Sequence, residues 1–555
     1  MRVNRFFLLL PLLFFFLINT VAIGQNYGKY WIFFKDKSSV GFNPLEYFDT
    51  KAIERREAAG LPMSDNTDWP VNENYIASVE ALADSVGKST RWFNAVVCYA
   101  KTSQLESIKK LPFVTEIIPF STSSASLAFI ENPKQDKAEE MYKKLSREDQ
   151  HLLASQTASM GIKQFEEQNI DGRGIRIAIF DAGFPGVNTH PAFDHIRKSG
   201  RIIKTWDFVQ NKEHVYGYNP HGTMVMSCIG GIIDSIKIGL ATGAEFILAR
   251  TERAKFEPFS EEENWLAAAE WADKNGAHII NSSLGYTHHR YFKEQMDGSY
   301  SLVSRAANMA ASKGILVVNA AGNEGGKSWK TIGTPADADS VLAVGGIDPD
   351  KFYHITFSSY GPNARKKMKP NVSAFGKVIA AGKANLSLAN GTSFASPLIA
   401  GFAACAWQKN PKLNNMEIFK EIEKSGDLYP YYDYVHGFGI PRANYFTQEN
   451  SPNIVPTFHV FVDNSFVKIT IKEEYLPKKD LNSTLNELVS NETLNYEAQR
   501  IFYLYYHIEN SQGFLNKYFI VNVKQAEVLS LPVSDFKPGQ TVRFHYKGYT
   551  EEFKF

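Results

Sequence analysis

The chain has 555 residues, of which 44% are hydrophobic and 21% are charged, as in ordinary globular proteins. This length exceeds that of one compact domain and predicts about two to four domains. The 60 basic residues nearly balance the 59 acidic residues, and a net charge of +1 makes nucleic acid an unexpected partner. Composition excludes a disordered or fibrous chain and identifies no function.

Residues 1–24 have the features of a secretory signal peptide. Arg2 and Arg5 precede an apolar run over residues 6–18, and small residues follow before Gln25. The run is shorter than the roughly 20 apolar residues that a membrane-spanning helix needs. We therefore expect cleavage before Gln25, a secreted protein that is extracellular or at the cell surface, and no membrane span in the mature chain. A retained membrane anchor is the alternative.

Residues 25–120 predict a small α+β domain. Aromatic and β-branched residues gather in strand-like segments, which are separated by segments of helical spacing. The predicted elements are strands over residues 30–34 and 91–100, a helix over 72–87, and a helix over 103–111 that Pro112 separates from a strand. Residues 121–159 are polar and predict a partly helical linker.

Residues 160–448 have the pattern of an α/β domain. Short apolar runs alternate with helical segments, which is typical of strands buried on both faces of a parallel sheet. The expected strands lie within residues 175–180, 244–249, 277–285 and 315–323, and the expected helices within 261–274 and 302–313. In such sheets the functional groups gather beyond the carboxyl ends of the strands.

Residues 449–555 predict a separate all-β, sandwich-like domain, because their apolar and polar residues alternate over several short segments. His459, His507 and His545 stand singly in these segments. Glu509 lies two residues after His507 and shares its strand face, which we interpret as a surface contact.

Four polar residues stand at predicted strand or helix ends in the α/β segment. Asp181 follows a buried strand, His221 precedes a helix rich in small residues, and Ser393 begins a long apolar helix. A serine hydroxyl becomes a good nucleophile when an imidazole takes its proton and a carboxylate orients that imidazole. Asn323, after another strand, offers a side-chain donor that with the Ser393 backbone N–H forms an oxyanion hole. Each pattern alone is weak, but their joint occurrence predicts nucleophilic catalysis.

These residues lie in motifs that resemble the subtilase family. The resemblance covers about residues 156–443, and the order Asp, His, Ser is that of subtilisin. The motifs are Asp-Ala-Gly at Asp181, His-Gly-Thr-Met-Val at His221, Asn-Ser-Ser-Leu-Gly at Asn281, Ala-Ala-Gly-Asn at Ala320 and Gly-Thr-Ser-Phe-Ala-Ser-Pro at Gly391. One departure is Ala182, where the family more often has Ser or Thr.

The resemblance implies a subtilisin-like parallel sheet with helices on both faces and a serine endopeptidase activity. It makes Ser393 the nucleophile, His221 the general base and then acid, Asp181 its orienting carboxylate and Asn323 the oxyanion donor. The segments implied to bind an extended substrate are Ser283, Leu284 and Gly285 on one side and Ala320, Ala321 and Gly322 on the other. Strand pairing reads the peptide backbone, so we expect broad activity on protein or peptide substrates.

The two flanking domains are interpreted separately. Residues 25–120 resemble a propeptide that assists folding and inhibits the enzyme, with an independent N-terminal domain as the alternative. Residues 449–555 are expected to be either an accessory domain or a sorting domain of the type IX secretion kind.

We expect a monomer and no cofactor. Calcium binding is common in the family, but no acidic loop is dense enough to assign ligands, so no metal site is predicted.

Two alternative interpretations differ from that of an active subtilisin-like endopeptidase. A catalytically silent subtilase-like binding or surface protein is the main alternative, although such a copy usually lacks a triad residue. An α/β-hydrolase is excluded, because no Gly-x-Ser-x-Gly surrounds Ser393 and the histidine precedes the serine. Cys98, Cys228 and Cys405 are too few and too scattered for a disulfide framework, so we expect free, buried thiols.

Overall fold

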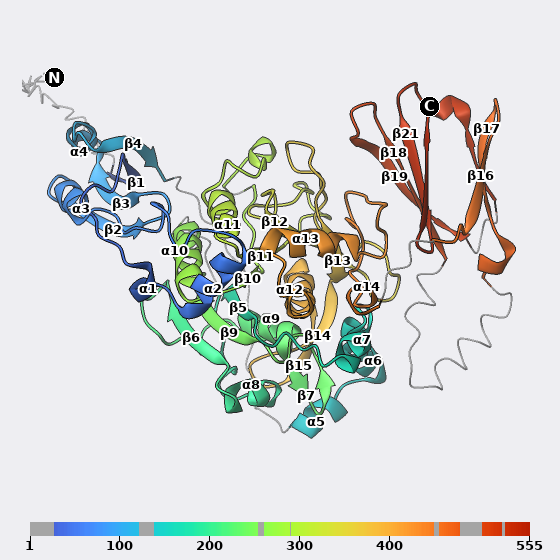
Figure 1. Ribbon diagram of the computed structural model, residues 1–555, viewed down its shortest axis with the longest axis horizontal. Coiled ribbons are helices and arrows are strands. Elements are labelled where there is room, and N and C mark those ends of the chain that lie inside the picture. Colours follow the sequence, from blue (N-terminus) through green and yellow to red (C-terminus); the bar gives the residue numbers. More distant parts are fainter. Residues whose placement is uncertain are drawn as a thin grey trace, which may run out of the picture.

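The structure is a computed structural model with three domains placed side by side (Figure 1). It describes residues 27–120, 138–253, 260–288, 290–448, 454–477, 502–523 and 528–555. The predicted signal peptide and the first part of the predicted linker lie outside these residues. Within the described ranges, no helix is both long enough and apolar enough to cross a membrane.

The N-terminal domain, residues 27–120, has a four-stranded sheet in the order β2-β3-β1-β4. Its strands are β1 (Tyr27–Phe34), β2 (Ser85–Thr90), β3 (Ala95–Lys101) and β4 (Val114–Pro119), and its helices are α1 (Pro44–Tyr47), α2 (Thr50–Ala58), α3 (Glu73–Glu80) and α4 (Thr102–Lys109). The helix predicted over residues 72–87 is shorter than expected. It ends at Glu80, because Val86 pairs with Cys98 in the sheet and packs against the domain core.

The central domain contains a parallel seven-stranded sheet in the order β13-β12-β11-β10-β5-β9-β6. The strands are β5 (Arg176–Asp181), β6 (Ile202–Asp207), β9 (Glu245–Arg250), β10 (Ile279–Ser282), β11 (Leu316–Ala320), β12 (Val341–Ile347) and β13 (Val372–Phe375). Helices α9 (His221–Gly230) and α12 (Thr392–Lys409) cover one face, and α10 (Ser260–Lys274) and α11 (Leu302–Ser312) cover the other. The predicted parallel α/β sheet is confirmed.

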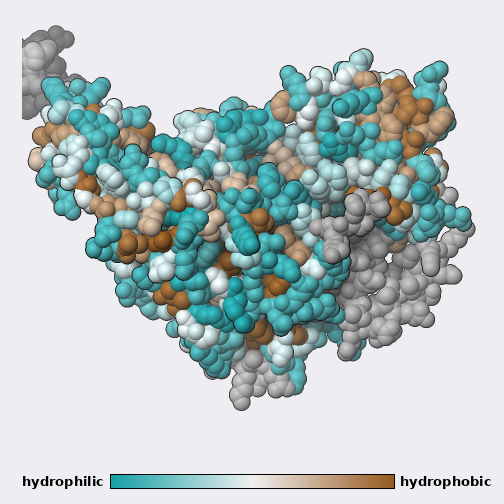
Figure 2. Space-filling model, in the orientation of Figure 1, coloured by the Kyte–Doolittle hydropathy of each residue, from teal (hydrophilic) through white to brown (hydrophobic). Residues whose placement is uncertain are grey.

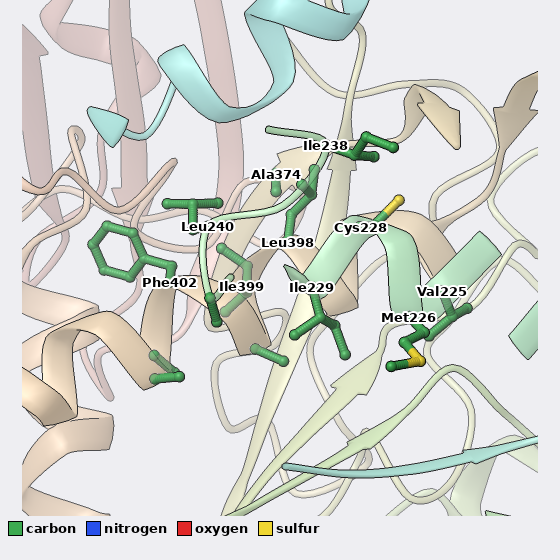
Figure 3. Packing of buried hydrophobic residues seen from close by; sticks show 14 of the residues in the cluster. Val225, Met226, Cys228, Ile229, Ile238, Leu240, Ala374, Leu398, Ile399 and Phe402 are labelled. Atoms are coloured by element: carbon green, nitrogen blue, oxygen red, sulfur yellow. The ribbon is translucent and has the colours of Figure 1, made fainter. Parts of the chain in front are cut away.

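Successive residues of each central strand enter opposite layers of the core. Ile177 and Ile179 of β5 join the layer under α9 and α12, whereas Ala178 and Phe180 join the layer under α10 and α11. Figure 3 shows part of the first layer, to which α9 contributes Val225 and Ile229 and α12 contributes Leu398. This double burial explains why the strands are apolar at nearly every position.

The three cysteines are free and buried. Cys228 and Cys405 lie in the layer under α9 and α12. Burial raises the pKa of the Cys228 thiol to about 12 and that of Cys98 to about 11. The thiols are therefore protonated and unreactive at neutral pH.

Several helices lie between or after the main elements of the central domain. They are α5 (Ala138–Lys143), α6 (Arg147–Ala158), α7 (Ile162–Glu167), α8 (Asp194–Lys198), α13 (Asn415–Lys424) and α14 (Asn444–Thr447). Two short strands, β14 (Lys377–Ala381) and β15 (Leu386–Asn390), form a hairpin before α12. Leu152 and Leu153 of α6 are buried in the main core, so this part of the predicted linker packs with the central domain.

The C-terminal domain is built from two antiparallel sheets that share one apolar core. Its strands are β16 (Phe458–Val462), β17 (Phe466–Ile471), β18 (Tyr503–Glu509), β19 (Leu515–Asn522), β20 (Val528–Pro532), β21 (Thr541–Tyr546) and β22 (Tyr549–Lys554). The predicted all-β sandwich is confirmed. In Figure 2 the surface over β16 and β17 is apolar, in agreement with the exposed side chains of Phe461, Val462 and Phe466.

The C-terminal domain packs against the central domain through aromatic and histidine side chains. Leu428 and Tyr431 of the central domain form a small buried cluster with Tyr505 of β18. His507 is fully buried there, with Nδ1 2.6 Å from the carbonyl oxygen of Tyr432 and Nε2 2.9 Å from Glu509. The interpretation of His507 and Glu509 as a surface contact is wrong, because the central domain covers this strand face.

Candidate active site

Asp181 and His221 lie together at the carboxyl edge of the central sheet. Asp181 is the last residue of β5 and is fully buried, and His221 is the first residue of α9. His221 Nδ1 lies 2.9 Å from each carboxylate oxygen of Asp181. A side chain at Gly222 would collide with the backbone of Gly183, so glycine is what lets α9 approach β5 closely.

The Asp181 carboxylate determines the state of the imidazole. Because a carboxylate accepts hydrogen bonds, Nδ1 of His221 carries the proton, and in the neutral ring the lone pair lies on Nε2. Burial opposes the charged form of His221, but the charge of Asp181 and its hydrogen bond outweigh burial and raise the pKa of His221 above 6.5. Ala182 lacks a side-chain hydroxyl, but its backbone N–H donates to Asp181 at 2.7 Å.

Ser393 is the second residue of α12, where the hydroxyl stands at the positive end of the helix. Its Oγ lies 3.3 Å from the carbonyl oxygen of Ser283, to which it donates. Among the described side chains, the structure records no hydrogen bond from Ser393 Oγ to His221. The two residues are neighbours all the same, because the rings of His221 and Phe394 have centroids 5.4 Å apart.

Asn323 follows β11 and is oriented by the residue before Ser393. Its Oδ1 accepts from the backbone N–H of Thr392 at 2.9 Å and from the Thr392 hydroxyl at 3.1 Å. These bonds leave the Nδ2 amide as the group that can donate to a ligand. A Cβ atom at Gly391 would lie 3.5 Å from Asn323 Nδ2 and 3.7 Å from Ser393 N, so the two predicted oxyanion donors lie close together.

The six residues predicted to bind substrate leave two neighbouring strands at the same edge. Ser283 to Gly285 follow β10. Ala320 is the last residue of β11, which pairs with β10 in parallel, and Ala321 and Gly322 follow it. Two hydrogen bonds join Ser283 to Ser393. Besides the bond from Ser393 Oγ to the Ser283 carbonyl oxygen, the Ser283 hydroxyl donates to the carbonyl oxygen of Ser393 at 2.8 Å. Asn319 donates to the carbonyl oxygen of Leu284 at 2.9 Å and holds this segment beside β11.

Three polar residues that the motif reasoning did not assign support this arrangement. Asn281 and Ser396 are fully buried and bonded to each other at 2.9 Å, and Asn281 also donates to Ser283 Oγ at 3.2 Å. Thr392, also buried, orients Asn323 as described above. A polar residue in the middle of a buried apolar strand, as at Asn281, is the sequence signal that could have indicated this network.

The N-terminal domain covers α10 and α11 of the central domain (Figure 1). Trp31, Trp92 and Val97 pack against Trp265 and its neighbours in one buried cluster. Basic residues of this domain also meet acidic residues of α10. Lys29 pairs with Glu263, and Arg55, Arg56 and Arg91 all pair with the fully buried Asp273.

These three arginines control the ionisation of Asp273. Burial opposes its charged form, but Arg55, Arg56 and Arg91 outweigh burial and lower the pKa of the carboxyl below 3.8. Asp273 is therefore ionised at neutral pH. Within the described ranges, no group of three or more His, Cys, Asp or Glu side chains is arranged to hold a metal ion.

Comparison with known proteins is consistent with this geometry. Residues 172–439 match the model of the subtilase family, and residues 29–140 match that of the peptidase S8 propeptide domain of Bacteroidota. Subtilisin BL from Lederbergia lenta is 30% identical over 263 residues, which cover 46% of this chain and 85% of that protein. Alkaline elastase YaB from Bacillus sp. (strain YaB) is 29% identical over 288 residues, which cover 50% and 67%.

One solved structure, that of MycP1 from Mycobacterium smegmatis, matches with a TM-score of 0.46 and 20% identity, and covers 60% of this chain and 91% of that chain. The match to the family model, over residues 172–439, includes the strands and helices next to which Asp181, His221, Asn323 and Ser393 lie. The chain therefore belongs to the subtilase family of serine peptidases and carries an N-terminal domain of the Bacteroidota S8 propeptide type.

Proposed function

We propose that this protein is a secreted serine endopeptidase that hydrolyses peptide bonds through Asp181, His221 and Ser393. The observation that carries the proposal is the Asp181–His221 hydrogen bond of 2.9 Å beside the first turn of α12, where Ser393 lies. This bond fixes the tautomer in which Nε2 of His221 accepts a proton. Membership of a serine peptidase family supports the same chemistry.

The reaction begins when Ser393 Oγ turns from the Ser283 carbonyl toward His221. Rotation about the Cα–Cβ bond of Ser393 moves the hydroxyl between staggered positions. His221 Nε2 takes the hydroxyl proton while Oγ attacks the substrate carbonyl carbon, and the carbonyl oxygen becomes an oxyanion. Asn323 Nδ2 and the backbone N–H of Ser393 donate to that oxygen.

The intermediate then collapses, and the carbon–nitrogen bond breaks. His221 gives its proton to the departing amine, which leaves an acyl group on Ser393. A water molecule attacks the acyl carbon after losing a proton to His221, and the same two donors stabilise the second oxyanion. Release of the acid restores the hydroxyl of Ser393. None of these steps requires a cofactor.

The substrate backbone pairs with the two segments that leave β10 and β11. Ser283 to Gly285 and Ala320 to Gly322 lie on the two sides of the proposed substrate site, and Ser283 is hydrogen-bonded to Ser393. Strand pairing uses backbone groups that every peptide has. Protein and peptide substrates with varied side chains are therefore expected.

The N-terminal domain is proposed to be the enzyme's own inhibitor, removed by cleavage between Phe120 and Gln168. Its apolar contacts with α10 and α11 and its ion pairs with Asp273 and Glu263 give it an interface that is complementary in apolar surface and in charge. The predicted signal peptide and the similarity to subtilisins support export of the protein. The C-terminal domain is proposed to act as an accessory or a sorting domain.

A serine-directed reagent tests the proposed function directly. A sulfonyl fluoride should label Ser393 and stop hydrolysis of casein, and the Ser393→Ala variant should neither react nor hydrolyse. A catalytically silent family member would show no hydrolysis in the wild type. Hydrolysis that survives Ser393→Ala in pure protein would exclude the proposed mechanism.

A further inference from the structure

A second aspartate–histidine pair lies in the loop between α13 and α14, away from the proposed triad. Asp433 and His436 are both fully buried, and Nδ1 of His436 lies 2.9 and 3.0 Å from the two carboxylate oxygens. The backbone N–H groups of Val435 and His436 also donate to Asp433 Oδ1. Burying a carboxylate is costly unless its partners are all in place, so this loop is built around the pair.

The other nitrogen of His436 holds a different part of the chain. Nε2 accepts from the backbone N–H of His354 at 2.9 Å, across 82 residues of sequence. A backbone N–H only donates and a carboxylate only accepts, so the proton of the ring is on Nδ1 and the ring is neutral. The ring of His436 thus connects Asp433 to the backbone of His354 through one hydrogen-bonded nitrogen on each side.

The segment that His436 holds, residues 354–359, is here called the supporting turn. His354 Nε2 lies 2.9 Å from the carbonyl oxygen of Ser358, to which it donates, and this bond closes the turn on itself. Ser358 and Ser359 are both fully buried. The supporting turn is therefore a compact unit whose first residue is anchored by His436.

The supporting turn in turn holds residues 322–325, here called the oxyanion loop. Ser359 N donates to Gly322 O at 2.9 Å, and Ser359 Oγ accepts from Glu324 N at 3.0 Å. Gly325 N donates to the carbonyl oxygen of Phe357 at 2.8 Å. These bonds clamp the backbone on both sides of Asn323. A side chain at Gly325 would collide with the supporting turn, so the two segments are in close contact.

The C-terminal domain covers the pair from the opposite side. The ring of Tyr505 on β18 packs edge-on against His436, with centroids 5.7 Å apart. Tyr431, which contacts His507 of the same strand, donates from its hydroxyl to Asp433 at 3.2 Å. The C-terminal domain thus contributes to the burial of the pair.

We propose that His436, oriented by Asp433, is a positioning residue for the oxyanion step, acting through the supporting turn on Asn323. This inference rests on the proposed serine peptidase function. An oxyanion donor works only within about 2.7–3.1 Å of the position that the oxygen will occupy. A displacement of about 1 Å can cost up to roughly 10²-fold in rate, so a distant anchor has a measurable effect on turnover.

The test is a double-mutant cycle with purified enzyme and a chromogenic peptide amide. Asn323→Ala should lower kcat by about 10²- to 10³-fold. His436→Ala should lower kcat by about 10-fold or more with KM within about threefold, because the oxyanion forms only in the transition state. In the Asn323→Ala background, His436→Ala should change kcat by less than about threefold, since the donor that it positions is gone.

Two further variants and a control complete the design. His436→Gln retains an amide oxygen that can accept from His354 N–H, and it should recover part of the lost kcat. Ser359→Ala removes the hydrogen bond from the Glu324 backbone N–H. If His436→Ala does not fold, Ser359→Ala takes its place in the double-mutant cycle with Asn323→Ala. For any variant too slow to mature, the cycle is measured from the first-order self-cleavage of the full-length chain. His459→Ala, exposed on β16, should leave kcat unchanged.

The outcomes separate the two proposals. No labelling of Ser393 in the wild type refutes the proposed function itself. Active wild type with equal, multiplicative losses from His436→Ala in both backgrounds refutes the positioning role and leaves the proposed function intact. Unchanged kcat in both His436→Ala and Ser359→Ala also refutes it. Loss of kcat that disappears in the Asn323→Ala background supports it.

Discussion

Asp273→Asn tests whether the N-terminal domain is held as an inhibitor by its arginines. Asp273 is fully buried, and Arg56 and Arg91 each lie 2.9 Å from its Oδ2. Arg56 also pairs with Asp68, and Arg91 also lies near Glu270. Among the ion pairs of the described residues, Arg55 has Asp273 as its single carboxylate partner.

The substitution keeps the side-chain volume but removes the negative charge. Removing one partner of a buried charge pair costs about 3–5 kcal/mol, because the remaining charge stays buried without compensation. Here the uncompensated charges appear only when the N-terminal domain is bound. At about 1.4 kcal/mol per tenfold change, the inhibition constant should rise by at least roughly 10²-fold.

The assay is inhibition of the mature enzyme by an added polypeptide of residues 25–120. Asp273→Asn enzyme should hydrolyse a small peptide as fast as wild type, because α10 carries no residue of the proposed triad. Asp350→Asn is the matched control, since its side chain is 76% exposed and its pair with Lys377 is a surface contact. An inhibition constant that changes by less than about threefold in Asp273→Asn would refute the reasoning.

Three other predictions concern the proposed site. Replacing Ser393 or His221 by Ala should lower kcat by at least about 10⁴-fold, measured as turnover per folded enzyme, and a smaller loss would contradict their roles. Because the pKa of His221 is raised above 6.5 and the neutral ring is the active form, kcat/KM should fall as pH drops through that raised pKa. If kcat/KM fell to half its maximum only below about pH 6, the pKa of His221 would be lowered and the prediction would be wrong. Full-length Ser393→Ala should remain uncleaved between Phe120 and Gln168, as seen by N-terminal sequencing, and cleavage at the wild-type rate in pure variant would exclude self-processing.

The central sheet was predictable because its strands are buried on both faces. The apolar runs at residues 175–180 and 315–323 correspond to β5 and β11, and the helical pattern at 261–274 to α10. Such continuous burial leaves a local signature in composition. The N-terminal domain was predicted less well. Helices α1 and α2 were not expected. The helical spacing over residues 72–87 predicted a helix where β2 begins, because the pairing of β2 with β3 outweighs the local helical preference.

The residues of the candidate site were assigned from the sequence on different grounds. Asp181, His221, Asn323 and Ser393 each occupy a short motif, and the order of these motifs along the chain is characteristic. The orientation of Ser393 Oγ toward Ser283 was not visible in those motifs, because it depends on a neighbouring strand. The burial of His507 was likewise missed, since a single strand does not reveal which domain covers it.

The sequence by itself determined the parallel sheet, the sandwich and the types of residue at the strand ends, because periodicity and motif spacing are local properties. Tertiary structure alone decided which charges and polar groups meet. Asp273 lies 218 residues from Arg55, and His354 lies 82 residues from His436, so no local pattern connects them. Hydrogen bonds and ion pairs act over a few ångströms in space, and their partners are therefore settled only when the chain has folded.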